Sequence, residues 1–152
     1  MVATGEASTI IARPAADILA FIMDVEAYRV VDPRLKTIRW VRRAAAETVF
    51  RFRPRLLGLP GPMTTQRVAL TPGVRVDISQ VPGPLDRLAD FHGLLECVER
   101  EDGTHVRRRL EFRFRRPLSW LLDPPLRRWL AHDVPAELAR LKTHLELPGR
   151  CV

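Results

Sequence analysis

The sequence has no apolar run that approaches the roughly 18 residues a helix needs to cross a bilayer. Its first residues, MVATGEASTIIARP, also lack the charged segment, long apolar stretch and small-residue cleavage site of a secretory signal. We therefore expect a cytoplasmic protein without a membrane span. A chain of 152 residues, 46% of them hydrophobic, is long enough for one sizeable core, so we expect residues 1–152 to form a single domain.

Cysteine and histidine are scarce, with two and four copies. Cys97 and Cys151 have neither a metal-binding spacing nor a disulfide framework, which favours a reducing compartment. His105, His132 and His144 show no metal-ligand spacing, and the sequence lacks a serine nucleophile elbow and a glycine-rich phosphate loop. We expect no metal and no cofactor.

Lysine is almost absent, since Lys36 and Lys142 are the two lysines among 25 basic residues. The net charge of +7 would suit a polyanionic partner, but the arginines are spread along the chain. Such a skew is typical of codon bias in a GC-rich bacterial genome, and without a nucleic-acid-binding motif we expect no nucleic-acid partner. One alternative is contact with an anionic membrane during lipid delivery. It would use outward-facing arginines, namely Arg107, Arg109, Arg113 and Arg115.

Hydrophobic periodicity predicts a strand and then a helix at the start of the chain. The segment ASTIIA is a short β-branched run, and Pro14 suits a first helical turn. The apolar residues that follow have the i, i+3, i+4, i+7 spacing of one helix face. They are Ile18, Phe21, Ile22 and Val25. The next segment, YRVVDP, predicts a second short helix or a turn, because Pro33 disfavours continuation.

From Leu35 to Arg116 the pattern changes to period two, interrupted by glycine- and proline-rich turns. Phe50 and Phe52 alternate with arginines, which is typical of an antiparallel sheet with one solvated face. The predicted strands cover about 35–43, 47–53, 63–70, 74–80, 88–99 and 104–116.

After Pro117 the helical period returns and continues nearly to the end of the chain. Asp123, followed by two prolines, resembles a helix cap and first turn, and Pro135 removes one internal hydrogen bond. We therefore expect one long C-terminal helix with a kink or break. Its apolar stripe consists of Leu118, Leu121, Leu122, Leu126, Trp129, Leu130, Val134, Leu138, Leu141 and Leu145.

This order of elements resembles the helix-grip fold of the START-like, or SRPBCC, superfamily of polyketide cyclases/dehydrases and lipid transport proteins. The resemblance covers almost the whole chain and rests on four motifs. They are YRVVDPRL, GPLDRL, EDGTHVRRRLEF and LARLKTHLE. It implies an α+β fold in which a curved, seven-stranded antiparallel sheet wraps around the long C-terminal helix, with one or two short helices after the first strand. It also implies a hydrophobic ligand cavity beneath that helix.

The segment THVRRRLEFRF raises a question, because Arg108 shares the inward parity of Val106 and Leu110. In the register that the resemblance implies, Asp90 and His92 on the preceding strand face the same cavity. Arg108 would then polarise a carbonyl, with Asp90 and His92 as partner and acid–base group. The alternative is a structural ion pair that fixes the strand register.

Local alternation conflicts with that register. The odd positions of the same strand form a cleaner apolar set than the even positions Leu88 to Glu96. A shift of one residue would send Asp90 and His92 to solvent and separate them from Arg108. The apolar set consists of Ala89, Phe91, Gly93, Leu95 and Cys97.

Apolar side chains on the sheet and the last helix are the candidate ligand-binding residues, although each could equally be ordinary core. The candidates are Phe50, Phe52, Leu57, Leu94, Leu110, Phe112, Trp129 and Leu130. The loop RPRLLGLPGP could be a flexible lid over the cavity entrance or a plain hydrophobic plug.

Three functional hypotheses follow. The first is a protein that binds a hydrophobic or aromatic small molecule, such as a lipid, polyketide or isoprenoid. The second is a polyketide aromatase/cyclase or dehydratase that uses Arg108 and His92. The third is a non-catalytic domain that binds a protein partner. The sequence does not fix the oligomeric state.

Overall fold

The computed structural model describes residues 2–83 and 89–147, so the predictions for Leu88 and Cys151 concern positions outside the described residues. The elements are β1 (Val2–Ile11), α1 (Ala15–Met23), α2 (Val25–Tyr28), β2 (Leu35–Arg43), β3 (Glu47–Leu56), β4 (Leu59–Pro60), β5 (Thr64–Thr71), β6 (Arg75–Gln80), β7 (Ala89–Arg100), β8 (Gly103–Phe114) and α3 (Leu118–Glu146).

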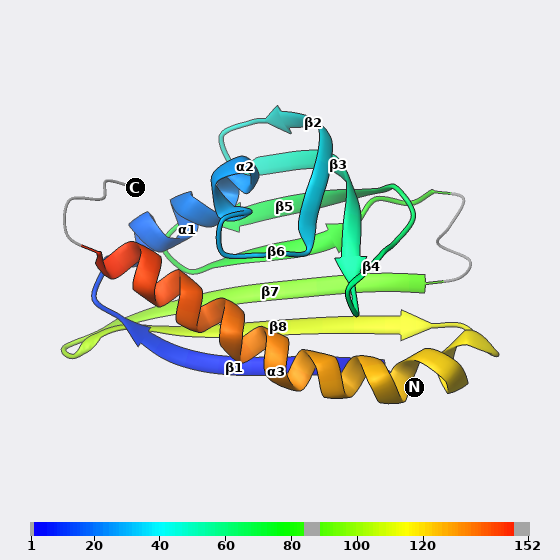
Figure 1. Cartoon of the computed structure of the whole chain (residues 1–152). Helices are drawn as coiled ribbons and strands as arrows, with labels where there is room; N and C mark the ends of the chain where they lie inside the picture. The colour runs from blue at the N-terminus through cyan, green and yellow to red at the C-terminus, as the bar shows by residue number, and fades with distance from the viewer. Residues whose placement is uncertain (1, 84–88, 148–152) are drawn as a thin grey trace.

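One curved antiparallel sheet forms the body of the protein, in the order β1-β8-β7-β6-β5-β3-β2, with the two-residue β4 paired to β3. The long helix α3 crosses the sheet along β1 and β8, while α1 packs against β5, β6 and β7 (Figure 1). The predicted α+β helix-grip arrangement is confirmed. Within the described residues, no helix is both long and apolar enough to cross a membrane.

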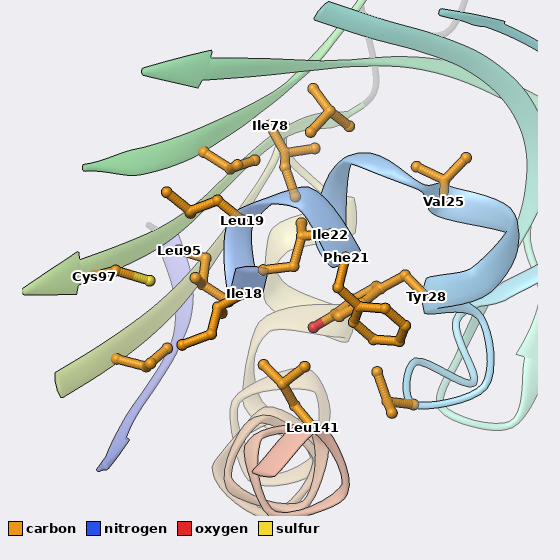
Figure 2. Close-up of a cluster of buried hydrophobic side chains, with 14 of the residues drawn as sticks. Ile18, Leu19, Phe21, Ile22, Val25, Tyr28, Ile78, Leu95, Cys97 and Leu141 are labelled. Carbon is orange, nitrogen blue, oxygen red and sulfur yellow. The ribbon is translucent and has the colours of Figure 1, made fainter. Parts of the chain in front are cut away.

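The helices after β1 fill the curve of the sheet at one end. The predicted apolar stripe of α1 is buried, and Asp24 caps α2 by accepting a hydrogen bond from the Ala27 amide. Figure 2 shows Ile18, Phe21 and Ile22 between Leu95 of the sheet and Leu141 of α3. The second helix covers Val25–Tyr28, earlier than the YRVVDP segment predicted it, and the chain then turns into β2.

The helix α3 differs from its prediction at its start and in its continuity. It begins at Leu118, so Asp123 is a buried residue inside the helix and not its cap. It also runs unbroken through Pro124, Pro125 and Pro135. All three prolines lie on the exposed side, where the carbonyl that loses its hydrogen bond can be hydrated by water.

Close contact between β1 and α3 depends on Gly5. A Cβ atom placed on Gly5 would lie 2.7 Å from Cβ of Leu130 and 2.9 Å from Cγ2 of Val134, well inside van der Waals contact. The turns of α3 that carry Leu130 and Val134 therefore lie directly against the backbone of β1. These turns belong to a second core cluster made of Ala3, Leu110, Phe112, Leu126, Leu130 and Val134.

We predict that Gly5→Ala lowers the free energy of unfolding by about 1–3 kcal/mol, because the new methyl group forces α3 away from β1. Urea unfolding followed by circular dichroism measures the loss. Gly83→Ala is the matched control, since a Cβ there meets no atom closer than the Val81 carbonyl oxygen at 3.9 Å. Equal losses in the two variants would contradict this account of the β1–α3 contact.

Candidate functional site

A cavity of about 60 Å³ lies between the concave face of the sheet and the segment that contains α1 and α2. Most of its wall is apolar, and the polar side chains that reach it are Tyr28, Asp32, Arg34, Gln66 and Arg108. The apolar part of the wall consists of Ile22, Val25, Leu35, Phe50, Phe52, Pro54, Leu56, Val68, Ile78, Phe91, Leu110 and Phe112.

Arg108 points inward from the middle of β8, as its parity predicts, and is 3% exposed. Its neighbours in the flanking strands are Ala7 of β1 and Leu95 of β7, neither of which offers a charge. The partner comes from the helix instead, because Nε of Arg108 lies 3.2 Å from Oε1 of Glu137. Arg108 is therefore accommodated inside the protein by a carboxylate on α3 and not by a partner on β7.

Glu137 joins three parts of the chain. Its side chain is fully buried, and it accepts a hydrogen bond from the Tyr28 hydroxyl of α2 and another from Nη2 of Arg34. Together with the contact to Arg108, these bonds tie α3 to α2, to the turn before β2 and to β8. A buried carboxylate needs such partners, since an unpaired one would be strongly disfavoured.

The guanidinium group of Arg34 contacts one carboxylate in its own turn and others on α3. Nε of Arg34 lies 2.9 Å from Oδ1 of Asp32, and Nη1 lies 3.3 Å from Oδ2 of Asp133. Burial acts to raise the pKa of Asp32, but the charge and hydrogen bonds of Arg34 outweigh it and lower that pKa overall. Burial raises the pKa of Asp133. The cluster thus contains two guanidinium groups and three carboxyl groups, so its positive charge is already balanced.

Three buried guanidinium nitrogens of the cluster have no hydrogen-bond acceptor among residues 2–83 and 89–147. Nη1 of Arg34 lies 3.3 Å from Asp133 and Nε of Arg108 lies 3.2 Å from Glu137, both without hydrogen-bond geometry, and the third is Nη1 of Arg108. Buried donors without acceptors are rare, and each is a candidate for an unrecorded water or ligand. Because Arg108 also lines the cavity, an oxygen atom placed there could accept this hydrogen bond.

The structure corrects the expected register of β7. Asp90 and His92 lie on the outer, exposed face, and Nε2 of His92 lies 4.0 Å from Oδ1 of Asp77 on β6. The inward face carries Phe91 and Leu95, so the local apolar alternation is right and the register implied by the resemblance is wrong here. The prediction that Asp90 and His92 share the cavity with Arg108 fails for the same reason.

The predicted ligand-binding residues divide into two groups. Phe50, Phe52, Leu110 and Phe112 line the cavity. The other four do not, because Leu94 has the outward parity of β7 and the rest pack against the second core cluster near α3. These three are Leu57, Trp129 and Leu130.

The segment predicted as a lid forms the hairpin between β3 and β4. Leu56 and Leu57 pack against the second core cluster and are partly buried, whereas Leu59 is 67% exposed. Leu56 also forms part of the cavity wall. The segment therefore has features of both the predicted plug and the predicted lid. Leu56 and Leu57 pack against the core as a plug would, whereas Leu59 is exposed.

Sequence reasoning missed six polar residues of the site, namely Tyr28, Asp32, Arg34, Gln66, Asp133 and Glu137. A signal was present for Glu137, because it occupies a position within the apolar stripe that includes Val134 and Leu138. Within the described part of the chain, no group of three histidine, cysteine, aspartate or glutamate side chains could hold a metal ion.

Glu137→Gln should destabilise the protein by about 3–5 kcal/mol, because it leaves two buried arginines without that counter-charge. Equilibrium unfolding in urea measures the change. Glu47→Gln is the control, since its salt bridge with Arg67 is exposed and should contribute about 1 kcal/mol or less. A loss no larger for Glu137 than for Glu47 would show that the buried charge network does not stabilise the fold.

Tyr28 offers a spectroscopic test, because it is the single tyrosine of the chain. Burial, followed by the charge of Glu137, raises its pKa well above 10.0. The stability from this neutral group is therefore present below pH 10 and is lost as the pH rises through the folded pKa. We expect tyrosinate absorbance to appear well above pH 10 in the folded protein and near pH 10 in urea. Identical titrations in the two states would contradict a buried, hydrogen-bonded Tyr28.

Comparison with solved structures gives the same fold at low sequence identity. The di-domain ARO/CYC StfQ from the steffimycin biosynthetic pathway has a TM-score of 0.74 and 16% identity, covering 96% of this chain. This chain spans about half of StfQ, 51% of its length. The Zhui aromatase/cyclase from Streptomyces sp. R1128 has a TM-score of 0.67 and 15% identity, covering 99% of this chain and 100% of Zhui.

A START superfamily protein from Mycobacterium smegmatis has a TM-score of 0.68 and 18% identity, covering 94% of this chain and 97% of its own. These similarities establish the fold. No curated protein sequence matches significantly. The family model described as "Polyketide cyclase / dehydrase and lipid transport" matches residues 2–146, and the chain therefore belongs to that family.

Proposed function

We propose that this protein binds a mostly apolar small molecule in the cavity, with a neutral oxygen of the ligand hydrogen-bonded to Arg108. The observation that carries the proposal is the buried Nη1 of Arg108, which lacks an acceptor and belongs to a side chain that lines an otherwise apolar wall. Lipids, polyketides and isoprenoids with a keto, quinone or hydroxyl oxygen fit this description.

Charge balance favours a neutral oxygen over a carboxylate or phosphate. The positive charges of Arg34 and Arg108 already face Asp32, Glu137 and Asp133 at short distances. An anionic ligand group would add a further negative charge to a buried cluster without surplus positive charge, which is costly at low dielectric. A neutral acceptor satisfies the free donor and adds no charge.

Cavity size sets a second condition. Pockets for drug-sized ligands are typically about 300–1,000 Å³, whereas this cavity has about 60 Å³. A ligand of polyketide or isoprenoid size must therefore widen it. Pro54 and Leu56 at the end of β3 belong to the wall, and they are the part of the lining nearest the hairpin tip.

A catalytic variant of this proposal is a cyclase or dehydratase in which Arg108 polarises a bound carbonyl. The Tyr28 hydroxyl donates its hydrogen to Glu137, so it is not free to protonate the ligand. His92 could not take part in the cavity, because its side chain is 52% exposed on the outer face. Two of the structural neighbours are named as aromatase/cyclases, which agrees with this variant.

A matched ligand series tests the neutral-oxygen preference. The probes are 2-acetylnaphthalene, 2-ethylnaphthalene and 2-naphthoate, which share one ring system and differ in their polar group. We expect the ketone to bind about tenfold more tightly than the hydrocarbon, because a hydrogen bond to a charged donor contributes about 1.5–3 kcal/mol. We expect the carboxylate to bind most weakly. Isothermal titration calorimetry measures the three affinities.

The variant for this test is Arg108→Met, because Glu137 keeps its hydrogen bonds from Tyr28 and Arg34 when Arg108 is removed. Its preference for the ketone over the hydrocarbon should disappear. Arg107→Met is the control on the outer face of the same strand, and it should keep the preference. Tightest binding of the carboxylate, or an unchanged ketone preference in Arg108→Met, would refute the proposed role of Arg108.

A further inference from the structure

Seven exposed arginines gather at one end of the protein. In the antiparallel sheet, β3 and β8 end at the same side, and the hairpin tip and the first turns of α3 lie there too (Figure 1). We name this region the basic end surface. Its arginines are Arg53, Arg55, Arg113, Arg115, Arg116, Arg127 and Arg128.

These arginines lack the carboxylate partners found elsewhere in the protein. Within residues 2–83 and 89–147, none of the seven forms a salt bridge, whereas Arg43, Arg67 and Arg107 each do. The sequence also contains no aspartate or glutamate between Thr48 and Val76. Asp90 is an exposed carboxylate at this end, opposite Arg113 in the sheet register. Among the described residues, the surface therefore has an excess of positive charge.

Large apolar side chains project from the same surface. Trp120 is 62% exposed and Leu121 is 76% exposed, both in the first turn of α3, and Leu59 projects from the hairpin. The guanidinium of Arg116 lies 5.5 Å from the ring centroid of Trp120. Exposed apolar residues of this size, surrounded by positive charge, mark an interaction surface. Trp and Arg together are suited to the boundary between lipid headgroups and acyl chains.

We propose that the basic end surface docks on an anionic lipid bilayer, with Leu59, Trp120 and Leu121 inserted at the headgroup boundary. Charge complementarity supports this occupant, since each basic residue near an anionic bilayer contributes about 1 kcal/mol. Trp120 and Leu121 are adjacent in the first turn of α3, and with Leu59 from the hairpin they offer large apolar side chains to the lipid interface. This proposal does not depend on the ligand-binding role of Arg108.

Vesicle flotation tests the proposal. The probes are vesicles of phosphatidylcholine alone and of phosphatidylcholine with phosphatidylglycerol, at low and at near-physiological salt. We expect the protein to bind the phosphatidylglycerol vesicles at least about tenfold more tightly than the neutral ones. Equal affinity for both vesicles, or no binding to either, would overturn it.

A protein with a net charge of +7 could bind such vesicles without a defined surface, so the key comparison holds net charge constant. Arg116→Glu with Arg128→Glu should weaken binding by at least about tenfold. Arg39→Glu with Arg42→Glu, two exposed arginines on β2, should weaken it by less than about threefold. Equal losses in the two double variants would mean nonspecific attraction and overturn the proposal.

Tryptophan fluorescence gives a second measurement with conservative variants. Trp40 and Trp120 are both exposed, and each lies beside an arginine, Arg42 and Arg116. If Trp120 enters the headgroup region, vesicles should shift the emission of the Trp40→Phe variant to the blue and leave that of Trp120→Phe nearly unchanged. The reverse pattern would place the contact on β2 and contradict the proposed surface.

Discussion

A buried carboxylate, Glu137, is the constraint on which the interior depends. A negative charge without solvent contact is stable only if donors surround it, and here they come from Tyr28, Arg34 and Arg108. Each donor belongs to a different element, so satisfying one side chain fixes α3 relative to α2, the turn before β2 and strand β8. The same contacts hold Arg108 inside a strand whose other inward residues are mostly apolar.

The charge network and the apolar core stabilise the fold in different ways. Apolar packing between α1 and the sheet is tolerant, because residues of similar volume can replace one another at small cost. The network is less tolerant, because removing Arg34, Arg108 or Glu137 leaves buried charged or polar groups without a partner. It therefore specifies where α3 lies more strongly than it adds to the net free energy of folding. Gly5 also fixes the position of α3, because Leu130 and Val134 of the helix pack there against the backbone of β1 with no side chain between them.

Much of the fold was predictable from the sequence, because the period of the apolar pattern is a local signal. The strand predicted over 35–43 matches β2, and the alternation around Phe50 and Phe52 matches β3. The register of β7 was predictable from its own apolar positions, and the error came from giving the resemblance more weight than the pattern. Local alternation reports burial directly, whereas a distant relative can differ by one residue in register.

The polar cluster was not predictable in the same way. Arg108 was visible as an arginine at an apolar position, but its partner lies 29 residues away on a helix and no local rule connects the two. Asp32 and Arg34 are adjacent to a proline turn and resemble ordinary loop residues. The course of α3 through its prolines was missed although none of the three belongs to the apolar stripe, which indicates that they face water, where a proline interrupts a helix least.

The same network limits where the cavity can widen. Moving α3 as a whole would break the contacts of Glu137 with three elements at once and would leave this buried carboxylate without its donors. The hairpin between β3 and β4 has no such anchor: it packs through Leu56 and Leu57, and its turn holds Leu57 at φ 55°, a left-handed conformation that costs a non-glycine residue about 1–2 kcal/mol. Displacing the hairpin would cost the apolar contacts of Leu56 and Leu57 but would leave the contacts of Glu137 intact. Widening for a ligand should therefore begin at the hairpin, which carries one wall of the cavity and one part of the basic end surface.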